Sequence, residues 1–262
     1  MNLKGNTIFV TGGGSGIGRG IAEALHNLGN KGIISGRRKS ALDEVTKANP
    51  GIESVDLDIE DVSSIANVSK TLIERYPDLN VLFNNAGIMQ FDDAAGTIDE
   101  TLLTSTITTN LFGPIRLTSA LIEHLKKQES AAVLNVSSVL GFTPMAIAAV
   151  YSSTKAALHS YSQSLRFKLR NTRVRVLEVI PPWVRTELLN SSEESRAMPL
   201  DEFLQETMEA LATDADEIMV ARAKFLRDQA GPDESAFVNT FNERFEVQPP
   251  EATPVQEVVS RS

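Results

Sequence analysis

Short apolar and β-branched runs alternate with longer amphipathic stretches over the first two thirds of the chain. The short runs predict strands, and the amphipathic stretches predict helices. We expect strands at 7–10, 32–35, 52–57, 81–83, 131–136 and 174–180. We expect helices at 17–28, 40–48, 62–76, 100–128, 150–170 and 201–212. Repeated strand–helix alternation predicts an α/β fold with a doubly wound parallel sheet and helices on both faces.

The length of the chain fits one domain. Its 262 residues, 42% of them hydrophobic, are enough to bury a full core, and no linker divides them. We therefore expect a single domain over residues 1–247. Within it, the polar and irregular stretch that begins near 187 and the helix after it, 187–212, are expected to form a substrate flap. The proline-rich tail at 248–262 is expected to be disordered.

Composition and charge narrow the function classes. The net charge of −9 disfavours nucleic acid and anionic membranes as partners. The absence of cysteine excludes disulfides and thiol catalysis. The three histidines, His26, His124 and His159, lack metal-ligand spacing, so we interpret them as structural or exposed and expect no metal site. Because no signal peptide or membrane span is apparent, we expect a cytoplasmic protein.

A glycine-rich run lies between the first predicted strand and the first predicted helix. It reads Thr11-Gly12-Gly13-Gly14-Ser15-Gly16-Ile17-Gly18. Glycines let the backbone turn sharply and approach a ligand, and the following helix N-terminus offers free N–H groups to an anion. A lone glycine-rich run is more often a flexible turn, but this one has the strand–turn–helix context of a dinucleotide site. It predicts a Rossmann-type NAD(P)-binding domain.

Tyr151 and Lys155 lie four residues apart in a predicted helix and therefore share one face. An ammonium group beside a phenol favours the phenolate, so we expect the pKa of Tyr151 to fall from its usual value of about 10. Such a tyrosine can exchange a proton with a carbonyl or alcohol oxygen near neutral pH. Taken alone, the pair is more often an aromatic core residue beside a solvated charge.

Several further motifs agree with this pair in order and spacing. They are Gly12-x-x-x-Gly16-x-Gly18, Asn84-Asn85-Ala86-Gly87, Asn110 within the long predicted helix, and Ser138 before Tyr151. Together they resemble the short-chain dehydrogenase/reductase family from about residue 6 to residue 186. The resemblance implies an oxidoreductase that transfers a hydride between NAD(P)H and a carbonyl or secondary alcohol.

The resemblance also implies a role for each catalytic residue. Tyr151 would exchange the proton with the substrate oxygen, and Lys155 would lower its pKa and hold the ribose hydroxyls of the cofactor. Ser138 would hydrogen-bond the substrate oxygen, although the adjacent Ser137 competes for this role. Asn110 would place a water that links Lys155 to solvent.

The glycine-rich run and the resemblance together assign residues to the two ligands. The cofactor set is Thr11, Gly12, Gly14, Ser15, Gly16, Ile17, Gly18, Arg37, Asp58, Asn85, Ala86, Gly87, Tyr151, Lys155 and Thr186. The substrate set is Ser138, Met145, Tyr151 and Trp183, with Met89 and Leu188 nearby. Asp58 would contact the adenine amine or cap a loop, and Trp183 would line the pocket or pack in the core.

The end of the second predicted strand bears on the choice of cofactor. NAD-specific sites place an acid there, whereas this chain reads Ser35-Gly36-Arg37-Arg38-Lys39. Arg37 could bind a 2′-phosphate through two of its guanidinium nitrogens, or it could be a solvated charge at a helix start. The pattern favours NADP(H), with NAD(H) as the other candidate.

The C-terminal third departs from the family pattern. Most relatives end with a seventh strand and a glycine-rich turn that build a tetramer interface. This chain has residues 215–223 and then the helix-like stretch 237–245, an ending similar to the DltE-like branch. We expect no seventh strand, and we expect a homodimer formed through the two long helices in place of the tetramer.

Three functions remain open on the sequence. The first is a ketone reductase or alcohol dehydrogenase for a small or medium apolar substrate. The second is a 3-oxoacyl thioester reductase of fatty-acid synthesis, which would need a basic patch for an acidic carrier and is disfavoured by the net charge. The third is a binding protein that senses NADP(H) without turnover. Such proteins typically lose the tyrosine or the lysine, and this chain keeps both.

Overall fold

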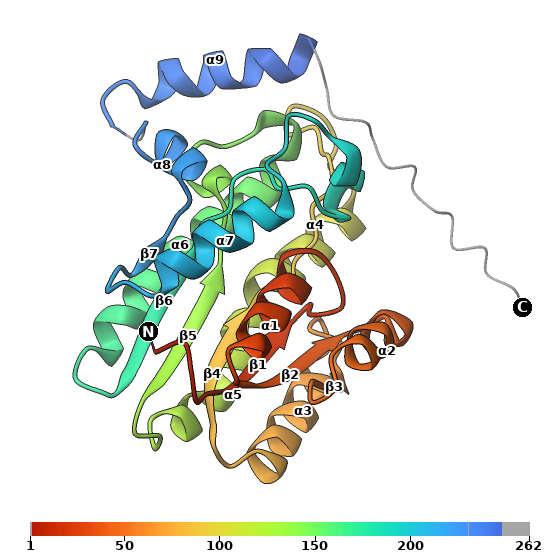
Figure 1. Cartoon of the computed structure of the whole chain (residues 1–262). Helices are drawn as coiled ribbons and strands as arrows, with labels where there is room; N and C mark the ends of the chain where they lie inside the picture. Colours follow the sequence, from red (N-terminus) through yellow and green to blue (C-terminus); the bar gives the residue numbers. More distant parts are fainter. Residues whose placement is uncertain (1, 230, 248–262) are drawn as a thin grey trace, which may run out of the picture.

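The computed structural model describes residues 2–229 and 231–247 and confirms the predicted alternation of strands and helices (Figure 1). The strands are β1 (Thr7–Thr11), β2 (Lys31–Gly36), β3 (Glu53–Asp56), β4 (Leu79–Asn84), β5 (Ala131–Val136), β6 (Val174–Val179) and β7 (Glu217–Ile218). The helices are α1 (Gly16–Asn27), α2 (Lys39–Ala48), α3 (Val62–Arg75), α4 (Glu100–Ile107), α5 (Gly113–Leu125), α6 (Ala149–Leu169), α7 (Leu200–Leu211), α8 (Ala221–Arg227) and α9 (Glu234–Val247). The predicted disordered tail at 248–262 lies outside the described residues.

The strands form one parallel sheet in the order β3-β2-β1-β4-β5-β6-β7. The direction of strand addition reverses between β1 and β4, which pair with Val10 opposite Phe83. In open α/β sheets, ligands bind at the carboxyl ends of the strands where this reversal occurs. The glycine-rich run follows β1, and the Asn85-Ala86-Gly87 segment follows β4, so the fold brings both to this position.

Two hydrophobic cores lie on opposite faces of the sheet. Along β1, Ile8 and Val10 belong to one core and Phe9 to the other, because successive side chains of a strand point to opposite faces. The first core includes apolar side chains of α1, α2 and α7, and the second includes those of α3 and α5. Helices therefore cover both faces, and the predicted doubly wound, single-domain α/β fold is confirmed.

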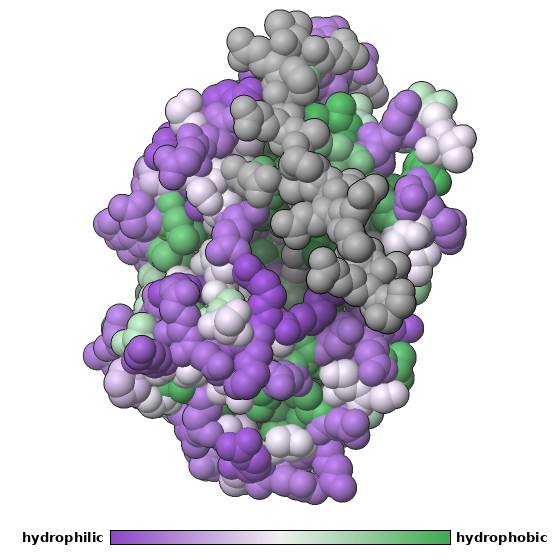
Figure 2. Space-filling view, turned by 90° about the vertical axis from the view of Figure 1, so that its right-hand side faces the viewer, coloured by the Kyte–Doolittle hydropathy of each residue, from purple (hydrophilic) through white to green (hydrophobic). Residues whose placement is uncertain are grey.

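Local signals explain where several helices begin. The Asp61 carboxylate accepts from the Ser63 backbone N–H at 2.8 Å and caps α3, and Asp99 caps α4 through the Leu102 N–H. Pro114 stands in the first turn of α5, where the fixed φ of proline suits a helical residue. The face of the molecule seen in Figure 2 is mostly hydrophilic, with hydrophobic residues in separate small groups.

Two expectations about the elements are wrong. The chain has a seventh strand after all, because Glu217 and Ile218 pair in parallel with Glu178 and Val179 of β6. Two residues are too few to give an alternating pattern in the sequence. The single long helix predicted at 100–128 is interrupted, because the five residues Thr108–Phe112 form a π-helical segment between α4 and α5.

The segment predicted as a substrate flap contains a 3-10 helix, Leu188–Glu193, followed by α7. It is tied back to the segment after β6, where Val184 pairs with Met198. Among residues 2–229 and 231–247, no helix combines the length and the apolar character needed to cross a bilayer.

Candidate active site

The glycine-rich turn is fixed to the neighbouring strand by Thr11 and Asn85. The Thr11 hydroxyl accepts from the backbone N–H groups of Asn85 and Ala86, each at 3.0 Å. The Asn85 side-chain amide donates back to the Thr11 carbonyl at 2.9 Å. A Cβ at Gly18 would lie 2.3 Å from the amide nitrogen of Asn85, so only glycine allows this close approach. These contacts hold the turn rigidly at the carboxyl end of β1.

The N-terminus of α1 is left available to a ligand. Ser15 occupies the N-cap position, yet its side chain makes no capping hydrogen bond. Its hydroxyl instead accepts from the Arg38 guanidinium at 3.0 Å. The first N–H groups of a helix lack partners within the helix, and they carry the positive end of its dipole. This is the geometry that binds a pyrophosphate.

Arg38 also contacts the flap. Its guanidinium lies 2.7 Å from the Glu187 carboxylate, so an ion pair joins the segment after β2 to the segment after β6. Thr186 lies beside the turn as well, because a Cβ at Gly16 would be 3.3 Å from the Thr186 side chain. The sequence analysis did not assign Arg38 or Glu187. The only sequence signal for Arg38 was its place beside Arg37 in a basic run.

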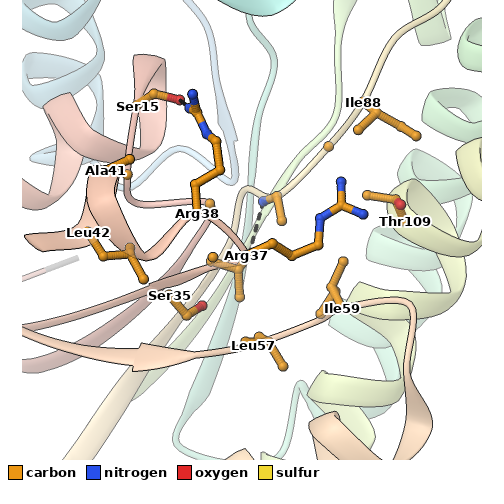
Figure 3. Close-up of a pocket in the computed structure, with 16 residues that line it drawn as sticks. Ser15, Ser35, Arg37, Arg38, Ala41, Leu42, Leu57, Ile59, Ile88 and Thr109 are labelled. Atoms are coloured by element: carbon orange, nitrogen blue, oxygen red, sulfur yellow. Dashed lines mark hydrogen bonds between the residues drawn. The ribbon is translucent and has the colours of Figure 1, made fainter. Parts of the chain in front are cut away.

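A pocket of about 230 Å³ lies beside the turn (Figure 3). Its lining includes Thr11, Gly12, Gly14, Ser15, Ser35, Arg37, Arg38, Ala86, Gly87 and Thr109. In the figure Arg38 turns toward Ser15, whereas Arg37 extends toward Ile88 and Thr109. Within the described residues, the hydroxyls of Ser35 and Thr109 are buried without a hydrogen-bond partner. Buried polar groups are normally paired, so these two orphaned hydroxyls fit a polar ligand in this pocket.

Two of the residues assigned to the cofactor do not line this pocket or the neighbouring cavity. Gly18 acts through the close packing described above. Asp58 is exposed, and its carboxylate accepts from the Glu60 backbone N–H at 3.0 Å, as a loop-capping aspartate does. Arg37 lines the pocket and pairs with Glu60 at 2.9 Å.

A larger cavity of about 500 Å³ adjoins the first pocket and shares Gly12, Ser15, Arg38, Ala86, Gly87 and Ile88 with it. Its lining brings together most of the remaining predicted residues. They are Gly16, Ile17, Asn85, Met89, Ser138, Met145, Tyr151, Lys155, Trp183, Thr186 and Leu188. The two spaces together form one continuous site along the carboxyl ends of β1, β4, β5 and β6.

Ser138, Tyr151 and Lys155 meet at the inner wall of this cavity. The Ser138 hydroxyl hydrogen-bonds the Tyr151 phenol and also accepts from the Leu140 N–H at 3.1 Å. The Lys155 ammonium donates to the Val136 carbonyl at 2.8 Å and lies 5.4 Å from the centre of the Tyr151 ring. The neighbouring Ser137 donates its hydroxyl to Glu178, which favours Ser138 as the serine that faces a substrate.

The expected shift of the tyrosine has the opposite sign in the structure. Burial raises the pKa of Tyr151 to about 12, and the hydrogen bond with Ser138 only partly opposes this. Burial likewise lowers the pKa of Lys155 to about 8, against the attraction of the Glu178 carboxylate, which raises it. Helical spacing alone predicted that the ammonium would lower the pKa of the phenol, but desolvation by burial is the largest cause of the Tyr151 shift, and it raises that pKa.

Asn110 lies in the π-helical segment and is almost completely buried. Its side-chain oxygen accepts from the Ile88 N–H at 2.9 Å, and its amide donates to the Ile88 carbonyl at 2.8 Å. It lines neither cavity, but a Cβ at Gly87 would lie 3.3 Å from Asn110 and 3.7 Å from the Lys155 ammonium. Asn110 therefore fixes the segment after β4, which carries Gly87, beside Lys155. π-Helical turns are frequent at functional sites.

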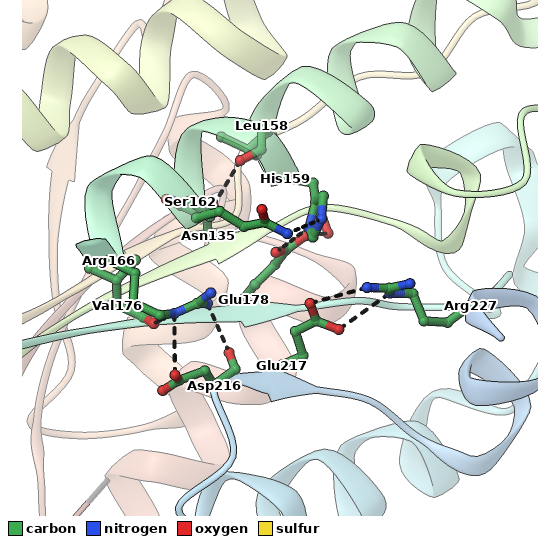
Figure 4. Close-up of polar contacts among 12 residues, drawn as sticks. Asn135, Leu158, His159, Ser162, Arg166, Val176, Glu178, Asp216, Glu217 and Arg227 are labelled. Carbon is green, nitrogen blue, oxygen red and sulfur yellow. Dashed lines mark hydrogen bonds and ion pairs between the residues drawn. The ribbon is translucent and has the colours of Figure 1, made fainter. Parts of the chain in front are cut away.

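A polar cluster lies behind these residues (Figure 4). Glu178 is fully buried on β6, accepts from the Ser137 hydroxyl and lies 2.8 Å from the His159 Nδ1. Glu217 pairs with Arg227 at 3.3 Å. The nearest ligand atoms of His159, Glu178 and Glu217 lie within 4.8 Å of one another. Each of the three is already engaged with a protein partner, so the group forms a hydrogen-bonded polar cluster.

Gly141 allows α6 to approach the turn that follows β5. A Cβ at this position would lie 2.9 Å from the Lys155 carbonyl carbon and 3.0 Å from the Ala156 nitrogen. Both neighbours are backbone atoms of α6 and have little freedom to move. The glycine therefore sets the distance between the turn after β5, which carries Ser138, and the helix that carries Tyr151 and Lys155.

The outer part of the larger cavity is apolar. Trp183 lines it, with its indole N–H donated to the Ser191 hydroxyl at 2.9 Å, so this residue belongs to the pocket wall. Leu226 of α8 and Phe241 and Phe245 of α9 also line it, and the sequence analysis had not assigned them to the site. The spacing of four residues from Phe237 to Phe241 to Phe245 is the signal that could have found them, because it places all three on one helix face.

Comparison with known proteins agrees with this geometry. The family model of the short chain dehydrogenases matches residues 6–197. The chain belongs to the short-chain dehydrogenase/reductase family. This short-chain dehydrogenase/reductase is 38% identical over 239 residues to the uncharacterized oxidoreductase DltE of Bacillus subtilis, covering 89% of this chain and 95% of that protein. The predicted family and its DltE-like branch are confirmed, and the protein is an oxidoreductase of this family.

The names of two further relatives include a cofactor. An NADP-dependent 3-hydroxy acid dehydrogenase of Schizosaccharomyces pombe is 33% identical over 191 residues, 71% of this chain and 74% of that one. The crystal structure of a short-chain dehydrogenase from Burkholderia cenocepacia in complex with NADP has a TM-score of 0.81 and 28% identity. That match covers 92% of this short-chain dehydrogenase/reductase and 98% of the other chain.

Proposed function

We propose that this protein is a carbonyl reductase that interconverts an apolar ketone and its secondary alcohol with NADP(H) as the favoured cofactor. The observation that carries the proposal is the convergence of Ser138, Tyr151 and Lys155 on one cavity that continues into the pocket beside the glycine-rich turn. A ketone that enters this cavity can place its oxygen against the two hydroxyl groups. A bound nicotinamide would supply the hydride, as the cofactor does throughout such chemistry.

The side chains have distinct parts in this reaction. Ser138 donates a hydrogen bond to the substrate oxygen and stabilises the negative charge that develops on it. Tyr151 gives its proton to that oxygen in the reductive direction and accepts it in the oxidative direction. The Lys155 ammonium stabilises the phenolate that Tyr151 becomes. Asn110 holds the backbone beside Lys155 and would place the water that links Lys155 to solvent.

The residues at the turn fit a phosphorylated dinucleotide. The uncapped N-terminus of α1 suits the pyrophosphate, and the orphaned hydroxyls of Ser35 and Thr109 suit the adenosine end. Arg37 and Arg38 both line the adjacent pocket and offer guanidinium groups to a 2′-phosphate. NADP bound to the Burkholderia relative supports the same preference. Thr186 would contact the nicotinamide carboxamide. An adenine contact by Asp58 is less well supported, because Asp58 is exposed and lines neither cavity.

The proposal includes a cytoplasmic homodimer. The absence of cysteine fits a reducing compartment. Phe112, 43% exposed beside α5, and Phe167, 62% exposed on α6, give the two long helices apolar side chains suited to an interface. Light scattering of the purified protein tests the dimer against a monomer and a tetramer. Nucleic acid and membranes remain disfavoured as partners by the net charge of −9.

A panel of carbonyl compounds with NADPH and with NADH, read by the loss of absorbance of the reduced cofactor, tests the proposal. We expect turnover of simple apolar ketones, with a higher kcat/KM for NADPH than for NADH. A strong NADH preference would contradict the role of the arginines. Preferential turnover of an acetoacetyl thioester would favour a 3-oxoacyl thioester reductase. Cofactor binding without turnover of any carbonyl would favour an NADP(H)-sensing protein.

A further inference from the structure

Helix α9 lies across one end of the molecule, over α8 and clear of the sheet (Figure 1). It carries a row of aromatic side chains on one face. The rings of Phe237 and Phe241 stack with centroids 6.5 Å apart, and those of Phe241 and Phe245 meet edge to face at 5.2 Å. Phe241 and Phe245 line the larger cavity, and Phe237 does not. The row therefore ends over the site of the reaction.

Two sets of hydrogen bonds attach this region to the loop that leads into the catalytic helix. The Asn242 side-chain amide donates to the Pro144 carbonyl at 3.0 Å, and its oxygen accepts from the Ala146 N–H. The Thr143 hydroxyl donates to the Leu226 carbonyl at 3.2 Å. Met145, between the two residues that Asn242 binds, is itself a buried lining residue of the cavity. The helix is therefore a fixed wall of the site.

The charges around the cavity are confined to its cofactor side. Among the described lining residues, the charged ones are Arg38, Glu187 and Lys155. Arg38 and Glu187 pair with each other beside the glycine-rich turn, and Lys155 lies behind Tyr151. The wall made by α8, α9 and the flap is instead apolar, with Leu188, Leu226, Phe241 and Phe245. A carboxylate on this side of a substrate would be buried without a cationic partner, which is strongly unfavourable.

We propose that α9 is the roof of an apolar subsite, and that the substrate is an uncharged ketone whose larger substituent, an aryl ring or a medium-length alkyl chain, packs against Phe241 and Phe245. This inference rests on the proposed carbonyl reductase function and specifies its substrate class. It separates this chain from enzymes that act on 3-hydroxy acids, whose substrates carry a carboxylate. Phe241, Phe245 and Leu226 are then residues that determine specificity, and Asn242 is a positioning residue for the roof.

Steady-state kinetics with ketones of graded size tests the roof. The substrates are butan-2-one, acetophenone, decan-2-one and the carboxylate acetoacetate. We expect the unmodified protein to prefer acetophenone and decan-2-one to butan-2-one, and to turn over acetoacetate poorly. Phe241→Ala and Phe245→Ala are expected to lower kcat/KM for the two large ketones roughly tenfold, because loss of apolar pocket contacts has effects of that order. The same variants are expected to change kcat/KM for butan-2-one less than about twofold, since the small ketone does not reach the roof.

Matched variants control for misfolding of the helix. Phe225→Ala removes an exposed aromatic residue that packs on Phe237 at 6.0 Å but lies outside the cavity lining, and it is expected to leave all four rates unchanged. Phe241→Leu retains apolar contact and is expected to keep most of the preference for large ketones. Asn242→Ala releases the roof while keeping both rings, so we expect a higher KM for decan-2-one and a smaller effect on butan-2-one.

A binding measurement separates this inference from the proposed function. Trp183 is the single tryptophan of the chain and lines the cavity, so its fluorescence reports occupancy without turnover. If decan-2-one binds to the unmodified protein and Phe241→Ala weakens that binding, the result would support the roof even if no ketone were reduced. Three results would overturn the proposed roof. They are equal losses of kcat/KM on small and large ketones in the Phe variants, no loss in either Phe variant, and efficient turnover of acetoacetate.

Discussion

Arg38 and Glu187 are 149 residues apart in the chain, and their side chains meet at 2.7 Å beside the glycine-rich turn. The two side chains are 62% and 60% exposed, so the ion pair contributes at most about 1 kcal/mol to stability. Its importance is its position, because Arg38 also contacts Ser15 and lines both parts of the cofactor site. An anionic ligand at this place would compete with Glu187 for the guanidinium.

Arg38→Ala and Arg37→Ala are each expected to weaken NADPH binding about tenfold or more, with a much smaller effect on NADH. A hydrogen bond between charged groups contributes roughly 1.5–3 kcal/mol, and only NADPH has the 2′-phosphate to receive it. Titration of each variant with both cofactors, followed by fluorescence, gives the dissociation constants. Lys39→Ala is the matched control, since Lys39 pairs with Asp43 and lines neither cavity. Equal losses for NADPH and NADH would contradict a 2′-phosphate contact.

Glu187→Gln is expected to tighten NADPH binding a few-fold at low salt. The substitution removes the carboxylate that occupies Arg38, and the gain should shrink as salt screens the competing ion pair. The measurement is the dissociation constant for NADPH across a series of salt concentrations. Glu194→Gln on the same flap, whose carboxylate contacts Arg196 at 2.7 Å outside the cavity lining, should leave affinity unchanged. An unchanged constant in Glu187→Gln would show that the ion pair does not compete with the cofactor.

Tyr151→Phe is expected to abolish ketone reduction while NADPH affinity changes little. In the proposed mechanism the phenol exchanges the proton with the substrate oxygen, and a phenyl ring has no proton to give. Turnover is followed by absorbance and cofactor binding by fluorescence. Tyr161→Phe, on the same helix but outside both cavities, serves as the control and should keep its rate. A Tyr151→Phe enzyme with near-normal turnover would remove Tyr151 as the proton donor.

The pH dependence of reduction should follow Lys155. Burial lowers the pKa of its ammonium to about 8, so the charged form predominates below pH 8 and is lost as the pH rises through that value. We expect kcat/KM for NADPH, which reports on the free enzyme, to fall above about pH 8. The Glu178 carboxylate raises the pKa of Lys155, so Glu178→Gln should move the decline to lower pH.

A matched variant distinguishes this electrostatic effect from general damage to the polar cluster. Glu217→Gln removes a carboxylate that pairs with Arg227 and lies in the same cluster. We expect its pH profile to match that of the unmodified protein. Identical profiles for Glu178→Gln and the unmodified protein would mean that Glu178 does not set the charge of Lys155.

Gly141→Ala is expected to lower both the melting temperature and kcat. The added Cβ would lie 2.9 Å from the backbone of Lys155, so α6 must shift away from Ser138. Overpacking of this kind costs about 1–3 kcal/mol, or several degrees in a domain of this size. Calorimetry and steady-state kinetics measure the two effects. Gly32→Ala, whose Cβ would find its nearest neighbour at an ordinary 3.5 Å, should be nearly neutral, and equal behaviour of the two variants would contradict the proposed strain.

Much of the fold could be predicted because its signals are local. The strand predicted at 131–136 matches β5 at both ends, since a strand buried on both faces is a continuous apolar run. The strand β7 was missed because its two residues, Glu217 and Ile218, are held by pairing with β6 and have no pattern of their own. The interruption of the long helix was missed as well, because the π-helical turn at Asn110 depends on the contact of its side chain with Ile88.

The residues of the site show the same division. The glycine-rich turn and the spacing of Tyr151 and Lys155 are visible in the sequence, because backbone freedom and helix periodicity involve neighbours along the chain. The direction of the Tyr151 pKa shift depends on desolvation by residues from other elements, and the helical pair by itself gave the wrong sign.

By itself, the sequence determined the family and the doubly wound sheet, and it pointed to the residues that we propose carry the chemistry, because each of these signals depends on short-range geometry. Only the tertiary structure decided that Arg38 meets Glu187, that Glu178 acts on Lys155, and that Phe241 and Phe245 line the cavity. Charges and apolar surfaces act through space at short distances, and the folded chain sets which distant residues come within those distances.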